Sequence, residues 1–187
     1  MKEKKEKNCI LDLDDTISDS VEHWIEYVSK KTHNSFDNLN VIKDSLSYSK
    51  YKEIKGEYRE SGEKLNIKVK EGAVKLCKKL KELGYTIIIL TRRPFYLHKC
   101  LFSVTKNWLY KNDIIYDALL MEDKKHLRII SEIENCRFVV DDNRYICNVI
   151  GNFGFKVFLL NNIYNQGELN NNVIRIKKLI DILKYVK

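Results

Sequence analysis

With 187 residues, of which 44% are hydrophobic, the chain is long enough for one globular domain with a small insertion. Its net charge of +8 is spread along the sequence rather than gathered in a Lys/Arg block, which favours a solvated basic surface over a nucleic-acid-binding stretch. No apolar run could span a membrane, the Lys/Glu-rich residues 1–7 precede no signal-peptide-like segment, and the five cysteines have no Cys-x-x-Cys spacing, so we expect a cytoplasmic protein without disulfides or a zinc site.

The first half of the chain predicts one strand followed by helices. Residues 8–13 form a short apolar run that ends in acidic residues, as a buried strand would. From Asp19 to about Lys31, and again around Tyr51 and Tyr58, apolar residues recur at helical spacing within a polar background. We therefore predict a small helical insertion over residues 19–68, within an α/β core formed by residues 1–18 and 69–187.

The second half alternates helical and strand patterns. Apolar, β-branched runs such as residues 85–90 predict strands that are buried on both faces. The predicted order is helix 71–83, strand 85–90, helix 95–110, strand 118–121, helix 124–134 with Leu127 facing inward, strand 137–140, helix 144–151, strand 156–160 and helix 173–186. Helical crossovers imply parallel, right-handed connections. The predicted fold class is therefore α/β, an open parallel Rossmann-like sheet with flanking helices and a small helical cap insertion.

Polar side chains follow the predicted strands at the points where they end. These residues are Asp12, Asp14 and Thr16 after the first strand, Thr91, Arg92 and Arg93 after the second, Lys124 after the third, and Asp141 and Asp142 after the fourth. Ligands of open parallel sheets bind beyond the carboxyl ends of the strands, so we expect these residues to share one site. Carboxylates brought this close repel one another unless a cation lies between them, and oxygen ligands of this kind suit Mg²⁺.

Each of these residues can have its own role in phosphoryl transfer. Asp12 can attack phosphorus as a carboxylate nucleophile, and Asp14, two residues later, can act as general acid and then as general base. The Thr91 hydroxyl and the Lys124 ammonium can bind the phosphate oxygens. Arg93 is the better of the two arginines for a substrate contact. Asp141 and Asp142 complete a metal site, whose ion neutralises the phosphate.

The same motifs, in the same order, resemble the haloacid dehalogenase-like superfamily. The sequence Ile-Leu-Asp-Leu-Asp-Asp-Thr-Ile matches the first motif, Ile-Ile-Leu-Thr the second and Val-Val-Asp-Asp the fourth, while Asp15 stands where many members have Gly. The third motif is a single lysine, for which we favour Lys124 over Lys125 because it follows Met121-Glu122-Asp123 at the strand exit. The resemblance implies a phosphatase, because Asp14 occupies the position that distinguishes phosphatases from dehalogenases. It also implies that Asp12 and Asp14 share in binding Mg²⁺, Asp14 through its backbone carbonyl.

Within the superfamily, the chain looks most like the 5′(3′)-deoxyribonucleotidase group. The insertion is short and directly follows the first motif, Asn107-Trp108-Leu109 resembles the Trp-bearing helix of that group, and residues 160–166 resemble its Tyr-Asn-containing end. The resemblance implies a Mg²⁺-dependent phosphomonoesterase that forms an aspartyl-phosphate and acts on a small substrate, a (deoxy)nucleoside monophosphate.

Two alternatives remain open. The phosphatase of phage-type polynucleotide kinases also has a hydroxyl-x-Arg second motif and a closing Asp-Asp, so Thr91 and Arg93 suit a polynucleotide 3′-phosphatase as well. A non-catalytic phosphate-binding module is the other alternative, although such a module has no need for both Asp12 and Asp14. Trp24 in the insertion can either stack on a nucleobase or pack in a core.

Overall fold

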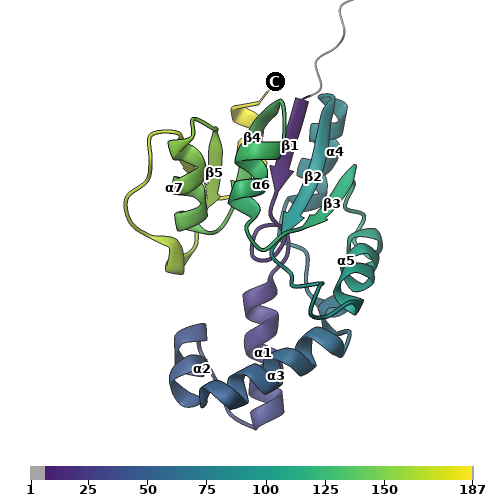
Figure 1. The fold of residues 1–187 in the computed structure, drawn as a ribbon, viewed down its shortest axis with the longest axis vertical. Coiled ribbons are helices and arrows are strands. Elements are labelled where there is room, and N and C mark those ends of the chain that lie inside the picture. The colour runs from purple at the N-terminus through teal and green to yellow at the C-terminus, as the bar shows by residue number, and fades with distance from the viewer. Residues whose placement is uncertain (1–6, 187) are drawn as a thin grey trace, which may run out of the picture.

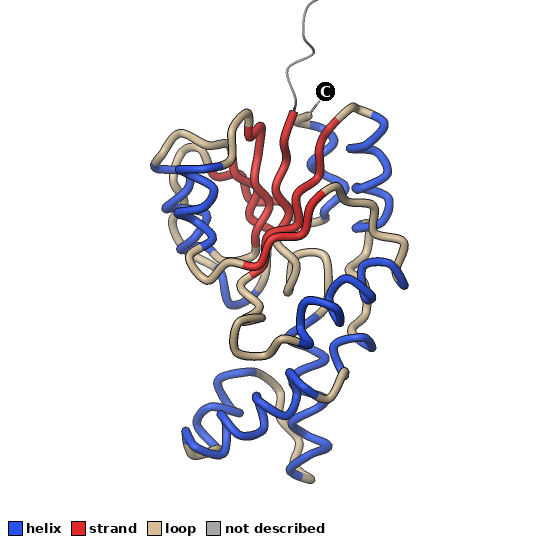
Figure 2. The backbone as a smooth tube through the Cα atoms, turned by 45° about the vertical axis from the view of Figure 1, so that its right-hand side comes forward, coloured by secondary structure: helices blue, strands red, loops and turns tan. Residues whose placement is uncertain are grey.

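The computed structural model describes residues 7–186, in which helices cover both faces of a six-stranded sheet (Figures 1 and 2). Of the Lys/Glu-rich residues 1–7, only Lys7 lies within the described part. The strands are β1 (Lys7–Leu11), β2 (Tyr85–Thr91), β3 (Ala118–Met121), β4 (Cys136–Asp141), β5 (Val157–Leu160) and β6 (Val173–Ile176). The α-helices are α1 (Ser20–Thr32), α2 (Leu39–Ser45), α3 (Tyr48–Glu60), α4 (Ala73–Glu82), α5 (Cys100–Lys111), α6 (Lys125–Glu132) and α7 (Arg144–Asn152), and the 3₁₀ helices are η1 (Glu63–Asn66), η2 (Ile163–Asn165) and η3 (Leu179–Lys184). None of the helices described is both long and apolar enough to cross a membrane.

The sheet has the order β3-β2-β1-β4-β5-β6, and every pair of neighbours is parallel. The chain builds β2 and β3 on one side of β1 and then crosses to β4 on the other side. Leu11, the last residue of β1, pairs with both Ile89 and Val140. The ends of these three central strands therefore meet where the strand order reverses, which is where open α/β sheets bind ligands. The predicted fold class is confirmed.

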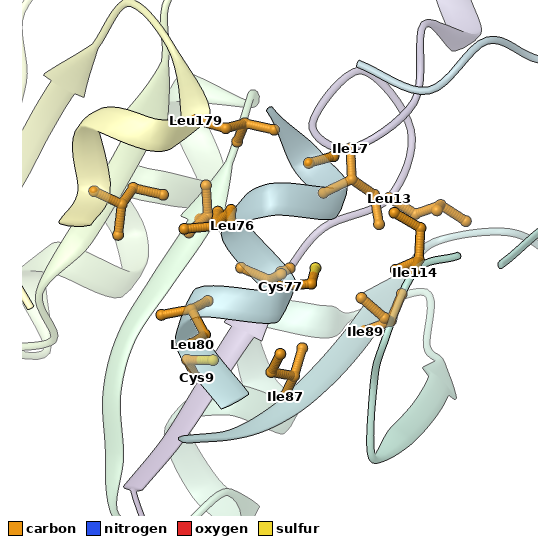
Figure 3. Packing of buried hydrophobic residues seen from close by; sticks show 14 of the residues in the cluster. Cys9, Leu13, Ile17, Leu76, Cys77, Leu80, Ile87, Ile89, Ile114 and Leu179 are labelled. Carbon is orange, nitrogen blue, oxygen red and sulfur yellow. The ribbon is translucent and has the colours of Figure 1, made fainter. Parts of the chain in front are cut away.

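Both faces of the sheet are buried, as the continuous apolar strands predicted. Cys9 and Leu11 of β1 lie on the face covered by α4, where they share a cluster with Leu80 (Figure 3). Ile10, between them in the sequence, lies on the opposite face in a cluster with Ile150 of α7. Side chains alternate between the faces of a strand, so both clusters depend on the same short segment. This rigid centre fixes the position of the residue that follows, Asp12.

The end of the chain differs from the prediction. Residues 173–186 were expected to form an amphipathic helix, but they form strand β6 and the 3₁₀ helix η3. β6 pairs with β5, with Ile174 opposite Phe158, and it covers backbone groups that β5 would otherwise leave unpaired. Arg175 is held over the neighbouring loop, since its guanidinium donates to the Asn165 side chain at 2.8 Å. Pairing with the preceding strand β5 thus outweighed the local helical pattern.

Residues 20–66 form a helical unit that lies beyond the carboxyl ends of the strands (Figure 1). Its helices have an apolar cluster of their own, centred on Trp24, which is only 2% exposed. The indole ring stacks on Tyr27 and meets Tyr51 edge-on, with ring centroids 6.1 and 5.8 Å apart. Of the two expectations for Trp24, the packing role is the one that the structure supports.

Replacing Trp24 by alanine is therefore expected to lower the free energy of unfolding by about 3–5 kcal/mol, because it empties the centre of this small core. Urea denaturation followed by circular dichroism measures the change. Tyr48→Ala is the matched control, since Tyr48 belongs to the same unit but is 74% exposed, and it should change stability by less than about 0.5 kcal/mol. Equal losses in the two variants would contradict a core role for Trp24.

Candidate active site

Asp12 is the first residue after β1 and is buried at the reversal point of the sheet. Its backbone N–H donates to the Val140 carbonyl at 2.9 Å, which extends the pairing of β1 with β4 by one residue. The Lys125 ammonium donates to Asp12 Oδ1 at 2.6 Å, and the Thr16 hydroxyl donates to Oδ2 at 3.1 Å. Lys125 Nζ also lies 2.6 Å from Asp141 Oδ2, so one ammonium joins the ends of two neighbouring strands.

The structure places Lys125, rather than Lys124, at these carboxylates, which corrects the expected position. Lys124 is exposed at the N-cap position of α6, whereas Lys125 is buried. Residues four apart lie on one face of a helix, and Lys125 shares its inward face with the buried Ile129. Leu127, which was expected to face inward, is 50% exposed. The register of α6 therefore decides which of the two lysines enters the site.

Three carboxylates gather around this lysine. Oxygen atoms of Asp12, Asp141 and Asp142 all lie within 4.8 Å of one another. Burial, together with the neighbouring Asp141 charge, raises the pKa of Asp12 to about 7. Burial and the Asp12 and Asp141 charges raise the pKa of Asp142 well above its usual range. A cluster in which carboxylates outnumber cations can accommodate a divalent cation, and carboxylate oxygens are the kind of ligand that Mg²⁺ takes.

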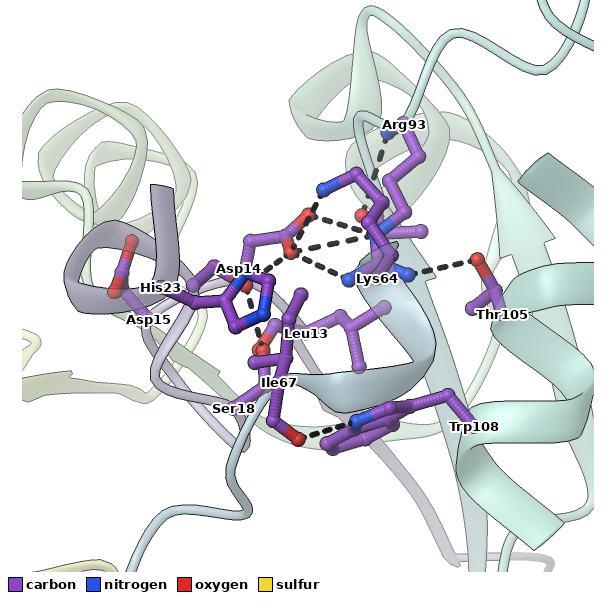
Figure 4. A network of polar contacts seen from close by, with 12 residues as sticks. Leu13, Asp14, Asp15, Ser18, His23, Lys64, Ile67, Arg93, Thr105 and Trp108 are labelled. Carbon is purple, nitrogen blue, oxygen red and sulfur yellow. Dashed lines mark hydrogen bonds and ion pairs between the residues drawn. The ribbon is translucent and has the colours of Figure 1, made fainter. Parts of the chain in front are cut away.

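The Asp14 side chain lies outside this cluster and has its own set of partners (Figure 4). Arg93 grips it with two nitrogens, Nη2 at 2.6 Å from Oδ1 and Nε at 3.0 Å from Oδ2, and Ser20 donates a further hydrogen bond. Lys64 Nζ lies 3.9 Å from Oδ1. Burial alone would raise the pKa of Asp14, but the Arg93 and Lys64 charges outweigh it and lower the pKa well below its usual range. Asp14 is therefore held as a carboxylate.

Arg93, expected as a substrate contact, donates its side-chain hydrogen bonds to other groups of the protein. Besides Asp14, its guanidinium donates to the Thr105 hydroxyl of α5 at 2.9 Å, and the residue is only 4% exposed. In this arrangement Arg93 positions Asp14, and its contact with substrate remains a prediction.

Thr91 ends β2 and is buried beside Asp12. The two residues line a cavity of about 140 Å³ together with Asp14, Arg92, Lys125, Asp142, Asn143 and Ile146. The Thr91 hydroxyl accepts the Arg93 backbone N–H at 3.3 Å, which leaves its own proton available for an anion. The cavity thus combines a carboxylate, a hydroxyl and an ammonium in a small space, as a phosphate group requires.

The backbone at Asp15 explains why glycine suits this position in similar motifs. Asp15 has φ 62°, in the left-handed region that aspartate tolerates better than most residues. Its carboxylate accepts the Val21 backbone N–H at 2.9 Å, at the start of α1. The sharp turn directly after Asp14 therefore leads the chain from the sheet into the helical unit.

Other partners could not be read from the sequence. The Tyr164 hydroxyl donates to Asp142 Oδ2 at 2.7 Å, and the Asn165 side chain donates to the Asp142 carbonyl at 2.8 Å. The Tyr-Asn pair was noted in the sequence only as a resemblance. Ser20 and Lys64 carried no signal, because a serine at the start of a helix usually serves as a cap and an isolated lysine usually faces water.

No protein-family model matches the chain. A nucleotidase of Clostridium acetobutylicum is 29% identical over 178 residues, which cover 90% of this chain and 87% of the relative. A haloacid dehalogenase-like hydrolase from Streptococcus pneumoniae superposes with a TM-score of 0.68 at 15% identity, over 96% of this chain and 98% of the other. The chain has the haloacid dehalogenase-like fold. The fold that the motif resemblance implied is thereby confirmed.

A further structure with this fold is of chemical interest. The D,D-heptose 1,7-bisphosphate phosphatase of B. bronchiseptica, solved in complex with magnesium and phosphate, superposes with a TM-score of 0.58. It is 12% identical and is matched over 96% of this chain and 99% of its own. At this identity the likeness concerns the haloacid dehalogenase-like fold alone.

Proposed function

We propose that the chain is a Mg²⁺-dependent phosphomonoesterase, specifically a nucleotidase that acts on (deoxy)nucleoside monophosphates. The observation that carries the proposal is the position of Asp12, which lines a small cavity with Thr91 and Lys125 at the reversal point of the sheet. The nucleotidase relative supports the substrate class. The phosphatase that was solved with magnesium and phosphate supports the metal.

In this proposal Asp12 attacks the phosphorus atom. A bond forms between the Asp12 carboxylate oxygen and phosphorus while the bond to the leaving oxygen breaks, which gives an aspartyl-phosphate. Thr91 and Lys125 bind the other phosphate oxygens and hold the group in line with Asp12. Asp12, Asp141 and Asp142, with the Asp14 backbone carbonyl, would hold Mg²⁺, which neutralises the negative charge of the phosphate when bound.

Asp14 supplies and removes protons. It gives a proton to the leaving oxygen in the first half-reaction, and it takes one from the water that cleaves the aspartyl-phosphate in the second. The ionised state held by Arg93 suits the second half-reaction. The first half-reaction needs a protonated Asp14. The contacts of Arg93 and Lys64 with the Asp14 carboxylate must therefore weaken when substrate enters. Because Lys64 belongs to the helical unit, we propose that residues 19–68 act as a cap whose position sets the protonation of Asp14.

A phosphate-release screen tests this function. The substrates are ribo- and deoxynucleoside monophosphates, sugar phosphates and 3′-phosphorylated oligonucleotides, each assayed at two salt concentrations. Mononucleotides should have the higher kcat/KM, with little effect of salt. Preference for oligonucleotides, with a rate that collapses as salt is added, would instead indicate a polynucleotide 3′-phosphatase, because contacts with several backbone phosphates make binding steeply salt-dependent.

Removing divalent metal is expected to abolish phosphate release, and adding Mg²⁺ should restore it. Without a cation, the carboxylates around Asp12 repel both one another and the incoming phosphate. Ca²⁺ should inhibit, because it prefers more ligands at longer distances and would draw Asp12 away from phosphorus. Activity is measured after chelation and dialysis, with the metal content checked by elemental analysis. Full activity in verified metal-free protein would contradict the metal assignment.

A further inference from the structure

A second cleft opens next to Asp14, between the helical unit and the sheet. It has a volume of about 260 Å³ and shares Asp14 and Arg92 with the phosphate cavity, so it begins where the leaving group of a substrate would emerge. Among the residues described, Asp14 and Asp15 are its acidic lining residues. Its basic lining residues are Lys43, Lys55, Arg59, Lys64, Arg92 and Arg93.

Some of these cations are neutralised by the protein and others are not. Arg93 and Lys64 interact with Asp14, and Arg92 Nη2 lies 3.5 Å from Asp123. Within residues 7–186, by contrast, Lys43, Lys55 and Arg59 have no carboxylate within ion-pairing distance. Lys55 and Arg59, one turn apart on α3, therefore bring unbalanced positive charge to the part of the cleft that α3 lines.

The environment of Lys55 makes its lack of an anion costly. Its ammonium lies 3.8 Å from the centroid of the Trp24 ring and 5.5 Å from that of Tyr58. Burial, and then the charges of Lys64 and Arg59, lower the pKa of Lys55 to about 7. Among residues 7–186, no oxygen acceptor lies within hydrogen-bond distance of the Lys55 ammonium. An anionic ligand would supply both the acceptor and the missing negative charge.

A neighbouring cleft, which shares Asp15, Val21, Leu39 and Lys43 with the basic one, has the opposite character. It is larger, about 890 Å³, and its lining includes five acidic residues, Asp15, Asp19, Glu22, Glu26 and Asp37, against two lysines. An anionic leaving group would be repelled there and attracted to the basic cleft. The two clefts therefore differ in charge, and this difference favours binding of an anionic leaving group in the basic cleft.

We propose that the preferred substrate carries a second phosphate on its leaving group, and that Lys55 and Arg59 bind it in the basic cleft. This inference rests on the proposed phosphatase function and narrows its substrate class to small bisphosphorylated molecules, such as nucleoside 3′,5′-bisphosphates. The same chemistry could come from the phosphodiester of an oligonucleotide end. At about 260 Å³ the cleft lies just below the roughly 300–1,000 Å³ of small-molecule sites, so it suits a compact bisphosphate better than a polymer.

The test compares substrates in pairs that differ by one phosphate. The pairs are a nucleoside 3′,5′-bisphosphate with its 5′-monophosphate, and ribose 1,5-bisphosphate with ribose 5-phosphate, and a 3′-phosphorylated dinucleotide is a further substrate. The enzymes are wild type, Lys55→Gln with Arg59→Gln, and the control Lys52→Gln, whose side chain is exposed on the same helix and does not line the cleft.

Wild type should favour the bisphosphate of each pair by about 10- to 100-fold in kcat/KM, the effect of one or two charge-assisted hydrogen bonds. The double variant should bring this ratio close to one while keeping monophosphate turnover within about twofold, and Lys52→Gln should match wild type. The wild-type ratio tests the inference even if the double variant fails to fold.

A wild-type ratio near one for both pairs, or a high ratio that the folded double variant retains, overturns the inference. If nucleoside monophosphates are hydrolysed and the second phosphate does not raise kcat/KM, the inference is overturned but the proposed nucleotidase function stands. If the enzyme prefers the sugar bisphosphate to the sugar monophosphate but hydrolyses no nucleotide, the nucleotidase proposal is overturned and the second-phosphate site is supported. A dinucleotide that exceeds the bisphosphate, with the same dependence on Lys55, supports the site and assigns it to a phosphodiester.

Discussion

Asp12→Asn is expected to lower kcat on the order of 10⁴- to 10⁶-fold, as loss of a covalent nucleophile does. The amide has the shape of the carboxylate but is a poor nucleophile. The fold should survive, because Lys125 keeps its contact with Asp141 and the amide oxygen can still accept from Thr16. Steady-state phosphate release measures the loss, and circular dichroism and urea denaturation establish that the variant is folded.

Asp15→Asn is the matched control for this variant. It makes the same chemical change three residues along the chain, where asparagine tolerates the left-handed backbone and its oxygen can still accept the Val21 N–H. It should retain most of the wild-type rate. In rapid-quench experiments with labelled substrate, wild type should incorporate phosphate and Asp12→Asn should not. A folded Asp12→Asn variant with more than a tenth of the wild-type rate would rule out the covalent route.

The central sheet could be predicted because its strands are short, continuous apolar runs that end in polar residues. The position of Asp12 beside Asp141 and Asp142 follows from topology alone, since parallel strands deliver their carboxyl ends to one edge. No side-chain detail is needed for that inference. The sequence alone therefore predicts that the first and fourth motifs lie together, although their roles in the reaction remain proposals.

Features that depend on contacts distant in the sequence were not predicted. The partners of Asp14 lie 79 residues away at Arg93 and about fifty away at Lys64, and no local pattern links them. Residues 173–186 have apolar residues that suit either a helix or a strand, and pairing with β5 decides between the two. The choice between Lys124 and Lys125 depends on where α6 begins, and a shift of one residue exchanges their environments.

This choice can be tested directly, because the two lysines are adjacent and chemically identical. Lys125→Met is expected to lower kcat/KM by about 10²- to 10³-fold, the usual cost of removing one donor to a developing charge. It should also lower the free energy of unfolding by about 3–5 kcal/mol, because Asp12 and Asp141 lose their shared buried cation. Lys124 is exposed, so Lys124→Met should keep the wild-type rate and change stability by less than about 0.5 kcal/mol.

Adding Mg²⁺ distinguishes the two roles of Lys125, which are to bind phosphate and to neutralise the buried carboxylates. A divalent cation bound by the carboxylates can replace the lost charge, so saturating Mg²⁺ should raise the melting temperature of Lys125→Met more than that of wild type. It should not restore the rate, since a cation at the carboxylates cannot replace the ammonium that binds phosphate. Thermal denaturation with and without Mg²⁺, together with phosphate release, gives both readouts for each variant. A larger loss of activity in Lys124→Met than in Lys125→Met would show that the register of α6 in the working enzyme differs from the one described here.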